Sequence, residues 1–102
     1  MLNGKNKKIL RGKAHSLKPV VQIGKNGLSK TVLSQINESL EVHELVKIKL
    51  VDFKDERKEI ASEIEKALKC DVCGIIGNTI IIFRQHEDPE KRRVKLTDET
   101  EE

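Results

Sequence analysis

The residues best suited to chemistry form a short loop, Gly24-Lys25-Asn26-Gly27, between an apolar run and an amphipathic stretch. Neither glycine carries a Cβ, so the backbone of such a loop comes close to a partner. A helix that starts after the loop adds unsatisfied N–H groups and the positive end of its dipole, which both favour a phosphate. The pattern predicts a loop that holds a nucleic-acid backbone. The alternative is a tight strand-to-helix connection whose glycines serve only the backbone angles.

Basic side chains gather in the first third of the chain. Residues 1–37 hold eight Lys and Arg and no Asp or Glu, a formal charge of +8. Residues 38–102 hold the other 12 basic residues and all 17 acidic residues, a formal charge of −5. This asymmetry favours an acidic partner for one end of the molecule, although a solvated lysine-rich helix has the same appearance. Together with the glycine loop, the charge predicts that Lys13, Lys18 and Lys30 widen a phosphate-binding face.

Length and composition limit the class of protein. A chain of 102 residues provides one modest core. It has no apolar stretch approaching the ~18 residues that span a bilayer and no signal-peptide core, which predicts a cytoplasmic protein without a membrane partner. The aromatic residues are Phe53 and Phe83, and at least one is expected in a core strand. A base-stacking platform is therefore not expected, and nucleic-acid contacts should involve phosphates, 2′-hydroxyls and shape.

Hydrophobic periodicity predicts the order helix–strand–helix–strand–helix–strand–strand. Helices are expected at 5–16, 28–41 and 55–69, and strands at 20–23, 45–51, 72–76 and 79–83. Either Ser29 or Asn26 caps the second helix. Two strand–helix–strand crossovers predict parallel pairs, and the terminal hairpin adds an antiparallel strand. The fold class is α/β, a small four-stranded mixed sheet packed with three helices. Residues 1–86 are expected to form the domain, and the charged residues 87–102 a mobile tail.

Three segments in the same order resemble the YhbY/CRM family, the RNA-binding domain of chloroplast RNA splicing and ribosome maturation proteins. They are residues 14–28, 43–49 and 76–84. The resemblance implies a fold similar to the C-terminal domain of bacterial translation initiation factor three. It also implies a partner, ribosomal RNA in precursors of the large subunit, while plant members in larger proteins bind group II introns.

The same resemblance assigns roles to particular residues. It makes Gly24, Lys25, Asn26 and Gly27 the RNA-contacting loop and adds Arg84 at the end of the last strand. Where the family often has a tyrosine before this arginine, the chain has a phenylalanine. Any role that depends on that hydroxyl is therefore in doubt here.

Cys70 and Cys73 have the spacing of half a zinc site or of a redox pair. A zinc site needs four ligands, and only scattered histidines are available as the others. A redox pair is favoured when its first cysteine begins a helix, whereas this pair follows a predicted helix. We interpret the cysteines as packing residues and expect no metal and no cofactor.

The chain has no P-loop, no dinucleotide fingerprint and no nucleophile–base arrangement, so neither an enzyme nor a small-molecule substrate is expected. The sequence thus predicts a non-catalytic protein that binds RNA. Two alternatives remain open. One is a protein-interaction adaptor that docks a partner on the acidic helix at 55–69, and the other is a factor for other structured RNAs such as introns.

Overall fold

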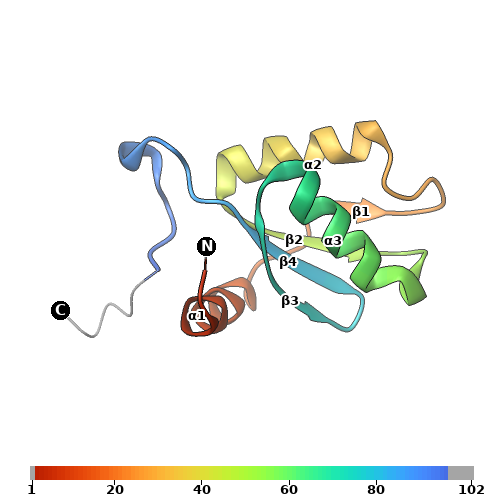
Figure 1. Ribbon diagram of the computed structural model, residues 1–102, viewed down its shortest axis with the longest axis horizontal. Helices are drawn as coiled ribbons and strands as arrows, with labels where there is room; N and C mark the ends of the chain where they lie inside the picture. Colours follow the sequence, from red (N-terminus) through yellow and green to blue (C-terminus); the bar gives the residue numbers. More distant parts are fainter. Residues whose placement is uncertain (1, 97–102) are drawn as a thin grey trace.

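The computed structural model describes residues 2–96 and shows a four-stranded sheet with helices on both faces (Figure 1). The elements are α1 (Gly4–Ala14), β1 (Val21–Ile23), α2 (Lys30–His43), β2 (Leu45–Leu50), α3 (Arg57–Leu68), β3 (Asp71–Ile76) and β4 (Thr79–Phe83). Short 3₁₀ turns span Lys54–Glu56 and Pro89–Lys91. The predicted fold class and element order are confirmed. Within residues 2–96, no helix has both the length and the apolar composition of a membrane span.

The strand order is β1-β2-β4-β3, which differs in one respect from the sequence prediction. The pair β1–β2 is parallel as predicted. The second predicted parallel pair is wrong, because β4 lies between β2 and β3 and pairs antiparallel with both. The reason is burial: Ile80, Ile81, Ile82 and Phe83 are all buried, which suits a central strand, whereas β3 is largely half-buried.

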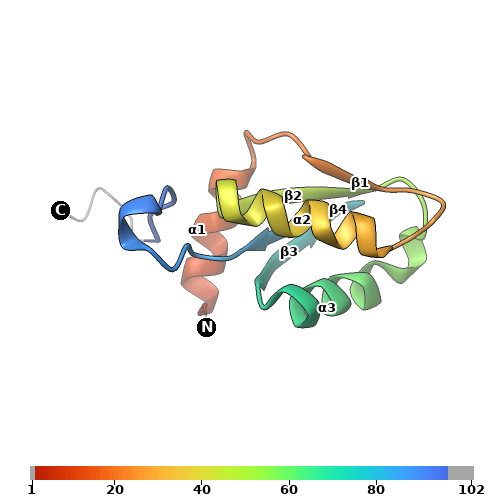
Figure 2. The same ribbon diagram turned by 90° about the horizontal axis from the view of Figure 1, so that it is seen from above.

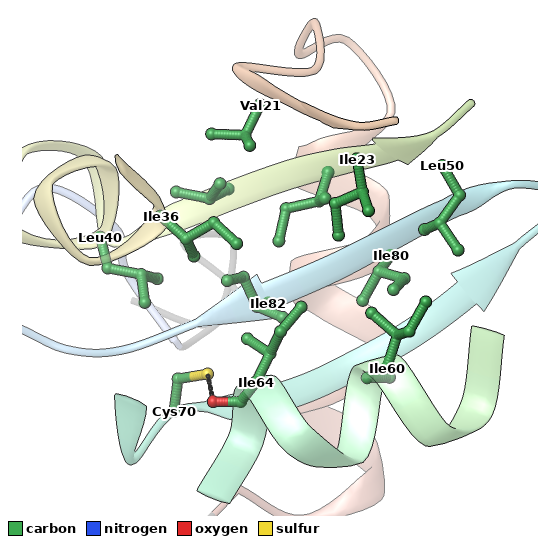
Figure 3. Packing of buried hydrophobic residues seen from close by; sticks show 13 residues of the cluster. Val21, Ile23, Ile36, Leu40, Leu50, Ile60, Ile64, Cys70, Ile80 and Ile82 are labelled. Carbon is green, nitrogen blue, oxygen red and sulfur yellow. Dashed lines mark hydrogen bonds between the residues drawn. The ribbon is translucent and has the colours of Figure 1, made fainter. Parts of the chain in front are cut away.

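Two hydrophobic clusters lie on opposite faces of the sheet. On one face, Ile36 of α2 and Ile64 of α3 pack against β1, β2 and β4 (Figure 3). On the other face, Leu10 and Ala14 of α1 pack against Ile81 and neighbouring side chains. Figure 2 shows α2 and α3 together over the first face, with α1 crossing the second. The division follows the alternation of side chains along each strand.

A buried carboxylate, Glu44, joins the end of α2 to the chain that follows β4. Glu44 is 1% exposed, and its backbone has a positive φ of 64°. The carboxylate accepts hydrogen bonds from the backbone N–H groups of His86 at 2.7 Å, Arg93 at 2.6 Å and Val94 at 2.9 Å. The Glu44 backbone oxygen accepts a fourth from the Arg84 N–H at 2.9 Å.

These contacts hold residues 86–94 against the folded domain. Val94 and Leu96 also pack onto the cluster beneath α1. The described part of the predicted tail therefore contributes to the core, while residues 97–102 lie outside the described residues. The boundary at residue 86 and the mobility of the tail stay predictions.

Burial alone raises the pKa of the Glu44 carboxyl. The N–H groups of His86, Arg93 and Val94, together with the charge of the nearby His86 ring, outweigh burial and hold the pKa below its ordinary value of 4.5. Because the folded pKa is the lower one, this stabilisation is complete above the unfolded pKa and is lost as the pH falls through the folded pKa.

The substitution Glu44→Gln should lower the free energy of unfolding by about 1–3 kcal/mol at neutral pH, because it weakens hydrogen bonds to buried donors. Chemical denaturation measures the change. The difference from the unsubstituted protein should shrink as the pH falls below 4.5. The exposed Glu38→Gln on α2 is the control and should change stability by less than about 0.5 kcal/mol. Equal effects of the two substitutions would show that the carboxylate does not hold this junction.

Candidate nucleic-acid interface

The glycine loop is a closed turn between β1 and α2. The Gly27 N–H donates to the Gly24 oxygen at 2.9 Å, and Gly27 has a φ of +64°, which favours glycine. Ser29 caps the helix, since its hydroxyl accepts the Val32 N–H at 3.2 Å. This settles the choice between the two predicted caps. Lys25 and Asn26 are exposed at the tip, and Lys30 is exposed at the first position of α2.

Phe53 lies against this loop, a contact that the sequence analysis missed. A Cβ on Gly27 would lie 3.4 Å from a ring carbon of Phe53, and the phenylalanine is 37% exposed. The contact arises because β1 and β2 are parallel, so the residues that follow them meet at one end of the sheet. The Val51 N–H donates to the Ile23 oxygen at 2.9 Å there. Predicting this neighbour requires the strand pairing, which periodicity alone does not give.

Lys13 and Lys18 lie at the other end of β1, where they line a cavity described below. Between them and the loop, Lys47 and Lys49 lie on the face of β2 that is turned towards α1, opposite the buried Val46 and Ile48. α1 packs on β2, β3 and β4, and Lys49 stays exposed. We call Lys13, Lys18, Lys47 and Lys49 the basic strip. It leads from the end of α1 towards the glycine loop.

Arg84 is not brought to the loop. It follows β4, whose end pairs with the start of β2, so it lies at the opposite end of the sheet. Its guanidinium donates to the Asn37 side-chain oxygen at 2.9 Å and the Leu68 backbone oxygen at 2.8 Å. A further contact at 3.8 Å joins it to the Glu41 carboxylate. These contacts tie α2 and α3 to the end of β4.

Charge near the loop is uneven. The connection between β2 and α3 carries Asp52, Asp55 and Glu56 as well as Lys54, and α3 begins with Arg57. This side of the loop is therefore mixed in sign. The basic strip, on the α1 side of the sheet, consists of lysines alone.

The two cysteines lie in different clusters, Cys70 on the α2–α3 side and Cys73 on the α1 side. Burial raises the pKa of the Cys70 thiol to about 12 and that of the Cys73 thiol to about 11. Such thiols are poor nucleophiles and poor metal ligands at neutral pH. Among residues 2–96, no group of three or more His, Cys, Asp or Glu is arranged to hold a metal ion.

The chain belongs to the CRS1/YhbY (CRM) domain family, whose family model matches residues 2–84. A Bacillus subtilis protein named "Probable RNA-binding protein YqeI" is 35% identical over 97 residues, which cover 94% of this chain and 99% of that protein. A Haemophilus influenzae protein named "RNA-binding protein" is 38% identical over 88 residues, covering 85% and 89%. The solution structure of protein SAV1595 from Staphylococcus aureus has a TM-score of 0.79 and 33% identity, and covers 93% of this chain and 100% of that one.

The two loop glycines should respond differently to alanine. Gly27→Ala places a side chain at a φ of +64° and against Phe53, which should lower the free energy of unfolding by about 1–2 kcal/mol. Gly24→Ala is the matched control, since its Cβ would meet nothing within 4 Å, and should change stability by less than about 0.5 kcal/mol. Thermal or chemical unfolding measures both. If Gly24→Ala lowered stability as much as Gly27→Ala, the result would contradict a turn in which Gly27 alone of the two glycines has a positive φ.

Proposed function

We propose that this protein is a non-catalytic RNA-binding protein that contacts the RNA backbone through residues 24–27 and the basic strip. The observation that carries the proposal is the closed Gly24–Gly27 turn at the start of α2, with Lys25 and Lys30 exposed beside it. Relatives named as RNA-binding proteins support it, and they are matched over most of their length.

In this mechanism the loop holds a phosphate. Lys25 supplies the charge, Asn26 a polar contact, and the start of α2 the positive end of a helix dipole. Lys13, Lys18 and Lys49 of the basic strip then neutralise neighbouring phosphates, and Lys30 adds charge on the α2 side. The ammonium of Lys47 is bound to the His15 and Leu17 oxygens and positions the segment after α1. We assign Arg84 a positioning role, because its guanidinium is committed to contacts within the protein.

Within this proposal the RNA is ribosomal RNA in precursors of the large subunit, bound in the cytoplasm. The adaptor alternative has less support. The exposed residues of α3 carry both signs, with Lys58 and Lys66 as well as Glu59 and Glu63. A helix face of mixed charge presents no uniform acidic surface to a partner.

RNA affinity should depend strongly on salt. If about five phosphates are neutralised, the logarithm of the association constant should fall with log salt at a slope of roughly −3 to −4 for a single strand. Lys25→Ala should weaken binding and reduce the slope by about 0.7, the share of one phosphate contact. Fluorescence anisotropy with a short RNA at several salt concentrations measures both effects. Lys66→Ala, at the far end of α3, is the matched control and should bind unchanged. A slope near zero would contradict the mechanism.

Sedimentation of cell lysate through a sucrose gradient tests the ribosomal partner. The protein should migrate with large-subunit precursors at low salt and leave them as salt rises, because phosphate contacts are screened. Migration only at the top of the gradient, by a protein that still binds RNA in the anisotropy assay, would remove the ribosome as the partner. It would direct attention to other structured RNAs.

A further inference from the structure

A cavity of about 480 Å³ lies at the N-terminal end of β1, between the end of α1, the start of β2 and residues 93–95. Its size falls within the roughly 300–1,000 Å³ of small-molecule sites. Residues 86–96 and the glycine loop lie at opposite ends of α2 (Figure 2), so this cavity is separate from the loop. Arg84, the remaining predicted contact, does not line it either.

Basic and apolar side chains both line the cavity, and we call the basic ones its rim and the apolar ones its floor. Its cationic lining residues are Lys13, Lys18, Lys47, Arg93 and Lys95. Among the described residues that line it, none is acidic. Positive charge around a recess with no acidic lining favours an anionic ligand.

The apolar side chains of the floor include two that are exposed. Leu17 is 41% exposed and Val20 is 50% exposed, and both line the cavity with the buried Leu45. Exposed apolar side chains inside a charged rim suit a ligand with a flat apolar part as well as an anionic group.

Both walls of the cavity are fixed by internal hydrogen bonds. The Lys47 ammonium donates to the Leu17 oxygen at 2.9 Å and the His15 oxygen at 3.3 Å, which anchors the segment after α1. On the other side, the Glu44 carboxylate holds the N–H groups of Arg93 and Val94. A recess that is organised before binding loses less entropy when it takes a ligand.

We propose that this cavity seats one nucleotide of the bound RNA strand, with the base on Leu17 and Val20 and its phosphate near Lys13 and Lys18. The inference rests on the proposed function and adds a second site to it. Gly24 lies four residue-to-residue steps after Val20 in extended chain, a distance of about 13 Å. A single RNA strand that follows the basic strip therefore reaches both the cavity and the loop.

Titration with adenosine 5′-monophosphate, followed by amide chemical shifts in NMR spectra of the full chain, tests the site directly. Shifts should occur at residues 13–20, 43–47 and 93–95 and not at residues 24–27. Adenosine and ribose 5-phosphate each lack one half of the recognised group, so each should bind at least about tenfold more weakly. Ribose 5-phosphate that binds as well as the nucleotide would overturn the base seat, because the cavity would then recognise charge alone.

Two double variants separate this site from the loop. Leu17→Ser with Val20→Ser removes the exposed apolar side chains of the floor, and Lys13→Glu with Lys18→Glu reverses the charge of two of the cationic lining residues. Each double variant should lower the affinity for the nucleotide and for a short single-stranded RNA about tenfold or more. Circular dichroism spectra confirm that the variants stay folded. Lys25→Ala is the matched loop variant. It should lower the affinity for RNA and leave the affinity for the nucleotide unchanged.

The outcomes distinguish the two proposals. If the cavity variants no longer bind the nucleotide but bind RNA normally, the cavity is a site for free nucleotides and the inference about the RNA strand fails. If they change neither, the cavity is not a nucleotide site, while RNA binding through the loop still stands. If the unsubstituted protein fails to bind any RNA, the proposed function fails whatever the cavity does.

Discussion

The parallel pairing of Val21–Ile23 with Ile48–Leu50 positions the whole candidate interface. Val21 and Ile23 are buried against the α2–α3 side, which fixes the orientation of this short strand. The glycine loop leaves one end of β1, and the basic cavity opens at the other. Loss of this edge pairing would displace both sites together, although neither site contains a residue of β1 itself.

Periodicity was sufficient to predict the helices and strands, because each element has one buried face with its own repeat. The alternation along β2 places Lys47 and Lys49 on the face opposite its buried residues. Periodicity could not give the strand order, since the central position of β4 depends on burial of both its faces. Ser29 was one of two acceptable caps, and only the turn geometry chose between them.

The candidate site was predictable where it is continuous in sequence and not where it is assembled by the fold. Residues 24–27 form one motif, so the sequence places their loop directly, while its contact with RNA stays a prediction. Phe53 reaches the loop only because two strands are parallel. Glu44 was missed because a single acidic residue between a helix and a strand looks like an ordinary surface residue. Arg84 matched a family motif, but its guanidinium is used to join elements of the fold.

Charge along the sequence also differs from charge in space. Arg93 and Lys95 belong to the net acidic part of the chain, yet the fold places them beside Lys13 and Lys18. The connection after β2, in contrast, brings acidic residues near the loop. A count of charges along the chain therefore overstates the positive charge beside the loop and understates it beside the cavity.

The helix α2 connects the two ends of the interface as one rigid rod. Its first turn follows the glycine loop, and its last residue, His43, lines the cavity next to the Glu44 clamp. A helix of 14 residues is about 21 Å long and does not stretch. In the proposed interface, α2 therefore holds the glycine loop and the cavity at a fixed separation, and an RNA strand that contacts both must match that separation.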